Sequence, residues 1–227
     1  VRTQSFTVGD AERFKTLTSS GTSGEKSKII LDKKTASLQQ KALLKISENF
    51  LGNDRLPMII VDNEKILSNK KLFSARAAAI LGFSIFGKDH TFLLNDKGNI
   101  DYEVLNDFLK RYKKEKFFIF GFTSFVYENL IEKLKKNLII SDFHNATLLH
   151  GGGWKKLENF KVSNKIFKNK LQTKLNLKRV HNYYGLVEQT GSIFIECKCG
   201  FFVTSNFSDI LIRDKNLKIA NSGEIGF

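Results

Sequence analysis

The feature that most restricts the fold of this chain is an unbroken apolar run at residues 117–122, Phe-Phe-Ile-Phe-Gly-Phe. A strand with one face in water alternates apolar and polar residues, whereas this run contains no polar residue. It therefore predicts a strand that is covered on both faces. Helices packed on both sides of a mostly parallel sheet provide such cover, so the run favours an α/β fold.

Strand-like and helix-like segments alternate along the chain up to Tyr184. Further strands are predicted at 28–31, 58–61, 91–94, 146–149 and 179–183. Helices are predicted at 33–50, 75–81, 101–112, 124–136 and 165–175. Asp32 and Asp101 are suited to cap two of these helices, and Gly52 is suited to end the first. The alternation predicts a mostly parallel sheet flanked by helices.

The last part of the chain has a different pattern, in which short strands follow one another without helices. These strands are predicted at 192–196, 201–204, 210–212 and 217–219. The pattern indicates a smaller antiparallel β region at the C-terminal end. We therefore expect an α/β core over residues 1–190 and an antiparallel extension of the same core over residues 191–227.

Composition narrows the class of protein. An apolar content of 41% with 21 phenylalanines among 227 residues indicates a folded globular chain. The net charge of +14 comes from 30 lysines and only 7 arginines. Because arginine is preferred for reading bases and gripping phosphates, we expect solvated lysine faces and no nucleic-acid surface. With no signal peptide or membrane-length apolar run in the sequence, the expected location is the cytoplasm.

A segment rich in hydroxyls and glycines precedes the first predicted strand. Its candidate phosphate ligands are Thr18, Ser19, Ser20, Gly21, Thr22, Ser23, Gly24 and Lys26. Glycines let backbone N–H groups approach an anion, and hydroxyls and a lysine add donors. The glycine spacing is not that of a Walker A loop. Because a flexible Ser/Gly linker has the same composition, the segment alone leaves both interpretations open.

Two glycine-bearing segments follow predicted strands, His150–Trp154 and Tyr183–Glu188. In open α/β sheets, ligands bind at the carboxyl ends of the strands, which is where both segments are expected. Glycines after strands are also common in ordinary turns, so neither segment is decisive alone.

Taken together, the three segments resemble the adenylate-forming superfamily, whose members activate carboxylates with ATP. The residues that carry the resemblance are TSSGTSGEKSK (18–28), HGGGWK (150–155) and YYGLVEQTGS (183–192). The set is most similar to the acyl-protein synthetase branch, which includes the luciferin-component ligase of bacterial bioluminescence and is related to phenylacetate–coenzyme A ligases. The resemblance covers nearly the whole chain and implies the N-terminal core of such an enzyme, truncated before the C-terminal lid domain.

The resemblance also implies roles for individual residues. The segment Thr18–Lys26 would hold the ATP phosphates, with Lys26 and Glu188 as catalytic residues. Glu188 would coordinate Mg²⁺, which prefers carboxylate and phosphate oxygens. Val187 stands where many relatives have a threonine that touches the α-phosphate. The remaining nucleotide-binding residues would be Gly151, Gly152 and Gly153 against adenine, Tyr184 stacked on it, and Asn182, Tyr183 and Gly185 beside it.

Several of these residues also have purely structural interpretations. Phe122, Thr123 and His150 are candidates for an acyl pocket, yet His150 and His181 are equally suited to structural roles. Tyr184 could be ordinary core, and Glu188 could favour the start of a helix. Cys197 and Cys199 could ligate a metal, although zinc sites usually need four ligands, or one could accept an acyl group.

The resemblance therefore implies an ATP-dependent acid–thiol ligase with ATP and Mg²⁺ as cofactors. It would activate a carboxylic acid, fatty acids included, for transfer to a protein cysteine, a carrier phosphopantetheine or coenzyme A. As a truncated core, the chain would bind ATP without efficient complete turnover. The alternative is a non-catalytic basic module that binds an acidic partner or nucleic acid with steep salt dependence and without using Tyr184 or Glu188.

Overall fold

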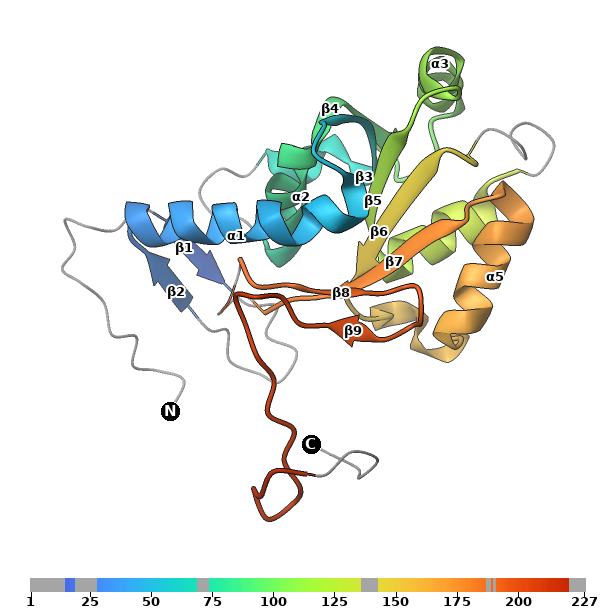
Figure 1. Cartoon of the computed structure of the whole chain (residues 1–227). Coiled ribbons are helices and arrows are strands. Elements are labelled where there is room, and N and C mark those ends of the chain that lie inside the picture. Colours follow the sequence, from blue (N-terminus) through green and yellow to red (C-terminus); the bar gives the residue numbers. More distant parts are fainter. Residues whose placement is uncertain are drawn as a thin grey trace.

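A computed structural model of the chain describes residues 15–18, 28–68, 74–135, 143–186, 189 and 191–220. Its centre is a seven-stranded sheet with the order β4-β3-β5-β6-β7-β8-β9. The first five strands in this order are parallel, and β8 and β9 are added antiparallel at one edge. The mostly parallel α/β fold and its smaller antiparallel region are therefore confirmed (Figure 1).

The strands of this sheet are β3 (Leu56–Asn63), β4 (Gly87–Leu94), β5 (Phe117–Phe122), β6 (Ala146–Gly151), β7 (Arg179–Tyr184), β8 (Phe194–Glu196) and β9 (Phe202–Val203). The principal helices are α1 (Lys33–Leu51), α2 (Ala75–Phe83), α3 (Tyr102–Tyr112), α4 (Thr123–Val126) and α5 (Asn164–Leu175). Short 3₁₀ turns are η2 (Glu64–Leu67), η3 (Ser84–Phe86) and η6 (Lys155–Phe160). A separate antiparallel pair joins β1 (Lys15–Thr18) to β2 (Lys28–Leu31). Of these strands, β1 was not expected from the sequence.

Alternate residues of β5 enter two hydrophobic clusters, one on each face of the sheet. Phe117 and Ile119 pack with residues of α3 and α5, whereas Phe118 and Phe120 pack with residues of α1 and α2. All four side chains are fully buried. Helices on both faces thus explain the unbroken apolar run at this strand (Figure 1).

The predicted helix caps are confirmed. The Asp32 carboxylate accepts from the Thr35 backbone N–H at 2.7 Å and from the Thr35 hydroxyl at 2.9 Å. These bonds hold the pKa of Asp32 below its usual value. Asp101 accepts from the Val104 backbone N–H at 3.1 Å, and α1 ends at Gly52, whose φ is +86°. Asp32 and Asp101 each supply an acceptor for a backbone N–H that has no partner inside the helix.

The helix predicted at 124–136 is confirmed as helical over residues 124–133, but most of this length is not α-helical. Only the short helix α4 is α-helical, and it continues as a π-helical segment, η4 (Tyr127–Lys133). The Asn129 side chain donates to the Phe125 carbonyl at 3.0 Å, and the Leu134 N–H bonds to the Asn129 carbonyl at 2.9 Å, five residues back. A side chain that bonds to the carbonyl one turn back competes with the backbone ladder.

The strands predicted at 210–212 and 217–219 are absent as strands. In their place is a hairpin closed by one isolated bridge between Arg213 and Ile219, with the Ala220 N–H donating to the Ile212 carbonyl at 2.9 Å. Leu211 and Leu217 are 60% and 73% exposed. Figure 1 shows this segment leaving the body of the molecule, so its strand-like sequence has no described sheet to join. Among the helices of the described ranges, none combines the length and apolarity needed to cross a membrane.

Candidate functional site

Strand register brings the predicted segments together at the carboxyl edge of the sheet. Phe122 at the end of β5 is paired with Gly151 of β6, and Gly151 is paired with Tyr183 of β7. The segments that follow these three strands therefore lie side by side, although they are far apart in sequence. This edge is where ligands of open α/β sheets bind.

The three consecutive glycines after β6 have three different surroundings. A Cβ on Gly151 would lie 2.4 Å from the Tyr183 ring and 2.7 Å from the Tyr183 backbone oxygen. Gly152 has a φ of +77°, and a Cβ there would lie 2.8 Å from the Phe122 ring. A Cβ on Gly153 would meet no described atom within 4 Å. Packing within the fold thus accounts for Gly151 and Gly152, whereas Gly153 faces open space.

The two adjacent tyrosines of β7 are in different environments. The Tyr183 ring packs edge-on against Phe83, with a centroid distance of 4.9 Å, and lies 6.0 Å from Phe120. Burial raises the pKa of the Tyr183 hydroxyl. The Tyr184 side chain is 51% exposed, and its neighbours are Phe194 and Phe202, at centroid distances of 6.3 and 6.4 Å. Tyr183 therefore belongs to the core, and Tyr184 offers an accessible aromatic ring.

Thr123 links the end of β5 to the end of β6. Its hydroxyl donates to the Gly151 carbonyl at 3.1 Å and lies 3.0 Å from His150 Nδ1. Because the hydroxyl proton is used at Gly151, Nδ1 must donate, which assigns the neutral tautomer with Nε2 as acceptor. Nε2 is buried and has no hydrogen-bond partner among the described residues. The link fixes the peptide of Gly151, at the start of the glycine turn.

His150 is a buried neutral base. Only 2% of the residue is exposed, and its ring lies 4.5 Å from that of Phe167. Burial, helped by the charges of Lys168 and His181, lowers the pKa of His150 to about 3. Burial also lowers the pKa of His181, whose Nδ1 lies 2.9 Å from the Glu196 backbone oxygen. Both histidines are thus held by contacts within the fold, and a role of Thr123 or His150 in an acyl pocket stays a prediction.

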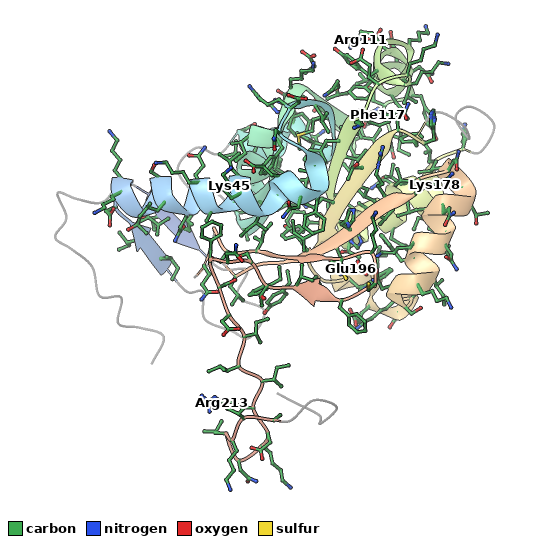
Figure 2. The ribbon with its side chains drawn as sticks, viewed as in Figure 1. Lys45, Arg111, Phe117, Lys178, Glu196 and Arg213 are labelled. Carbon is green, nitrogen blue, oxygen red and sulfur yellow. The ribbon has the colours of Figure 1, made fainter. Side chains whose placement is uncertain are left out.

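Sequence reasoning missed a buried carboxylate at the end of β8. Glu196 is 1% exposed and lies where β7, β8 and α5 meet (Figure 2). Its Oε1 accepts from Lys168 Nζ at 2.7 Å and from Asn164 Nδ2, and its Oε2 accepts from the Asn182 backbone N–H at 3.1 Å. A glutamate that ends the otherwise apolar stretch Ile193–Ile195 was the available signal.

An open hollow of about 570 Å³ lies between α1 and the segments that follow β7 and β9. Leu38 and Ala42 of α1 line it together with Phe207, and Lys41 lies at the same hollow. Gln189 also lines the hollow, and in the sequence it directly follows Glu188, the predicted magnesium ligand. Its size is within the range of small-molecule sites.

The predicted phosphate and magnesium ligands fall mostly outside the part of the chain that the structure describes. The segment from Ser19 to Lys26 and Glu188 lie outside the described residues, as do Val187 and Thr190. Thr18 is described only as the last residue of β1. Their proposed contacts with phosphate and Mg²⁺ stay predictions.

Among the residues that the structure describes, the cysteine pair has no larger cluster of metal ligands around it. Within the described ranges, no group of three or more His, Cys, Asp or Glu side chains could hold a metal ion. Cys197 and Cys199 are both free thiols in the turn between β8 and β9. The pKa of Cys197 is lowered, first by a hydrogen bond from the backbone of Phe201.

Sequence comparison decides the family. The profile described as "Acyl-protein synthetase, LuxE" matches residues 1–227. The chain belongs to the acyl-protein synthetase family. A search of curated protein sequences returned no match.

The fold of this acyl-protein synthetase family member is similar to that of several solved structures. The amide bond synthetase McbA from Marinactinospora thermotolerans has a TM-score of 0.58 and 13% identity over 93% of the chain. ATP-bound MatB from Rhodopseudomonas palustris has a TM-score of 0.58 and 14% identity, and a 2-hydroxyisobutyryl-CoA ligase has 0.56 and 12%. The chain spans 38% of the length of the first two and 48% of the third. At such identities the likeness shows the fold.

Proposed function

We propose that this chain is the nucleotide-binding core of an acyl-protein synthetase that activates a carboxylic acid as an acyl-adenylate. The observation that carries the proposal is the juxtaposition at the carboxyl edge of the sheet. There the exposed ring of Tyr184 ends β7, and the open position at Gly153 lies two residues after the end of the neighbouring strand β6. An exposed aromatic ring can stack on any base, and a glycine lets a flat ring approach the backbone.

In the proposed reaction a carboxylate oxygen of the acid attacks the α-phosphorus of ATP. The new bond joins that oxygen to phosphorus, the bond from the α-phosphorus to the bridging oxygen breaks, and pyrophosphate leaves. Lys26 and the hydroxyls of Ser19–Ser23 would stabilise the charge that develops on the leaving group. A Mg²⁺ ion held by Glu188 would supply further charge stabilisation when bound.

The proposal extends to the acid that is activated and to the group that accepts it. The hollow beside Gln189 has a mixed lining, in which Leu38, Ala42 and Phe207 are apolar and the other residues, charged ones among them, are polar or glycine. We propose that the three apolar side chains hold the apolar body of an acid such as a fatty acid. Family membership supports a thiol as the acceptor, either a protein cysteine, a carrier phosphopantetheine or coenzyme A. We further propose that the enzyme is cytoplasmic. We also propose that the boundary between its α/β core and the antiparallel extension lies near residue 190. Because β7 pairs with β8 across this boundary, the second part extends the same sheet.

Nucleotide binding tests the proposal directly. Saturating ATP should raise the melting temperature, since a ligand at 100 times its Kd stabilises the folded state by about 2.7 kcal/mol. Tyr184→Ala should remove most of this shift while leaving the free protein nearly as stable, because the ring is half exposed. Phe201→Ala is the matched control, since Phe201 is also an exposed aromatic, at 73%, next to β9. It should respond to ATP like the wild-type protein.

Catalysis is tested by pyrophosphate–ATP exchange that depends on added carboxylic acids of increasing chain length. The absence of any thermal shift with ATP would overturn the proposal. Affinity for a polyanion that falls steeply with salt and is unchanged in Tyr184→Ala would favour the basic binding module instead.

A further inference from the structure

The Glu196 carboxylate replaces a backbone partner at the point where β7 and β8 separate. Ladder pairing between these strands includes Tyr183 with Ile195 and Tyr184 with Phe194, and the next pair along would be Asn182 with Glu196. There the Asn182 N–H donates to Glu196 Oε2 at 3.1 Å. The Glu196 backbone oxygen has His181 Nδ1 at 2.9 Å. Two side chains thus make the contacts that would otherwise join the two backbones.

The carboxylate is held in place from the opposite side by α5. Lys168 Nζ lies 2.7 Å from Oε1, and Asn164 Nδ2 donates to the same oxygen. The Glu196 side chain is 2% exposed and that of Lys168 is 26% exposed, so water screens this pair weakly. A buried carboxylate with donors on both oxygens has little freedom to move, and its Oε2 is therefore a fixed acceptor.

We propose that Glu196 is a positioning residue that fixes Asn182 and, through it, the segment Tyr183–Gly185 at the nucleotide site. The inference rests on the proposed function, because it assigns Tyr184 the role of stacking on adenine. Asn182 immediately precedes the two tyrosines, so a shift of its peptide moves the partly buried Tyr183 ring and the exposed Tyr184 ring together. In this proposal Glu196 contacts the segment at the Asn182 N–H and does not touch the nucleotide.

The competing explanation is that Glu196 only attaches α5 to the sheet. In that case its loss would change stability and leave the affinity for ATP unaltered. The two explanations differ in the importance that they give to one atom, the oxygen that accepts from the Asn182 N–H. A pair of double variants can keep or remove this acceptor while removing the ion pair in both.

The first double variant is Glu196→Gln with Lys168→Met. Its glutamine oxygen can accept from the Asn182 N–H, and its amide nitrogen can donate to the Asn164 side chain once that amide has turned over. The second is Glu196→Leu with Lys168→Met, which fills similar volume and offers no acceptor. Both variants keep the net charge of the wild-type chain, because each removes one negative and one positive charge. Replacing a buried ion pair by neutral side chains is often tolerated.

The experiment measures ATP affinity by calorimetry and amide hydrogen exchange of the peptide that covers residues 182–185. We expect the glutamine variant to bind ATP within about threefold of wild type, and the leucine variant to bind roughly tenfold more weakly, the scale of one unsatisfied buried donor. Exchange at 182–185 should be faster in the leucine variant alone, with β6 as the unchanged internal reference.

Equal ATP affinities in the two double variants would overturn the positioning role, as would equal exchange rates at residues 182–185. A lower melting temperature of the leucine variant with unaltered ATP affinity would show that Glu196 only attaches α5. If wild-type protein fails to bind ATP, the proposed function fails, and the exchange comparison still decides whether Glu196 fixes Asn182.

Discussion

Alanine substitutions in the glycine turn after β6 separate the needs of the fold from those of the ligand. A Cβ at position 151 would lie 2.4 Å from the Tyr183 ring and 2.7 Å from its backbone oxygen, so the ring and strand β7 must both move. Overpacking of this kind costs about 1–3 kcal/mol. In a chain of this size the melting temperature falls by roughly 2–4 °C for each kcal/mol. Gly151→Ala should therefore be destabilised without nucleotide.

Gly153→Ala should behave in the opposite way. No described atom lies within 4 Å of the added Cβ, so the free energy of unfolding should change by no more than about 0.5 kcal/mol. If adenine lies against this turn, the new methyl group meets the base. We then expect ATP affinity to fall by roughly tenfold, which corresponds to about 1.4 kcal/mol.

The assay combines urea unfolding of the free proteins with calorimetric titration of ATP. Gly82→Ala in α2 is the control for an added methyl group, since its Cβ would also meet nothing described within 4 Å. It should keep wild-type ATP affinity, and its stability should be equal or higher because alanine favours helix. Wild-type ATP affinity in Gly153→Ala would refute the adenine placement, and wild-type stability in Gly151→Ala would refute the packing argument.

Two further predictions concern the link between β5 and β6. Thr123→Val leaves His150 Nδ1 and the Gly151 carbonyl without the Thr123 hydroxyl and should lower the free energy of unfolding by about 1–3 kcal/mol, measured in urea. Thr123→Ser keeps the hydroxyl and should retain most of the stability. Equal losses in the two variants would contradict the hydrogen-bond assignment. His150 has a folded-state pKa of about 3 against an ordinary value of 6.5, so only the unfolded state gains its proton as the pH falls below 6.5. Stability should therefore fall with pH from 6.5 towards 3, by up to about 1.4 kcal/mol per pH unit from this group. The slope should flatten in His150→Gln and persist in the control His90→Gln, since His90 is exposed; an unchanged slope in His150→Gln would refute the buried neutral base.

The sequence determined helices and strands in two situations. In one, a side chain bonds to the backbone a few residues away, and in the other, a hydrophobic pattern is compatible with only one degree of burial. Asp32 and Asp101 cap helices because a carboxylate three residues before a free N–H can reach it. Residues 117–122 form a buried strand because an all-apolar segment must be covered on both faces. Family membership was likewise visible in the order of three short motifs. These signals are local, and the structure and the comparisons confirm them.

Other features depended on contacts that no local pattern encodes. The hairpin around Arg213 has strand-like sequence on both sides of its turn, yet it is left without a described sheet. The sequence gives no direct sign of which neighbouring strand is available, because strand pairing is decided between distant segments. Local strand propensity is overridden there.

The candidate site shows the same division. Its motifs could be predicted from the chain, but the register of β5, β6 and β7 decided which residues meet. The triplet at 151–153 reads as three equivalent glycines, yet only Gly153 is left open once Tyr183 and Phe122 have packed. A role for Glu196 was not predicted from the sequence, because its carboxylate gains its partners only when β7, β8 and α5 come together. Sequence determines what each segment prefers to be, and tertiary packing decides which groups become partners, since burial and hydrogen bonding depend on neighbours far away in the chain.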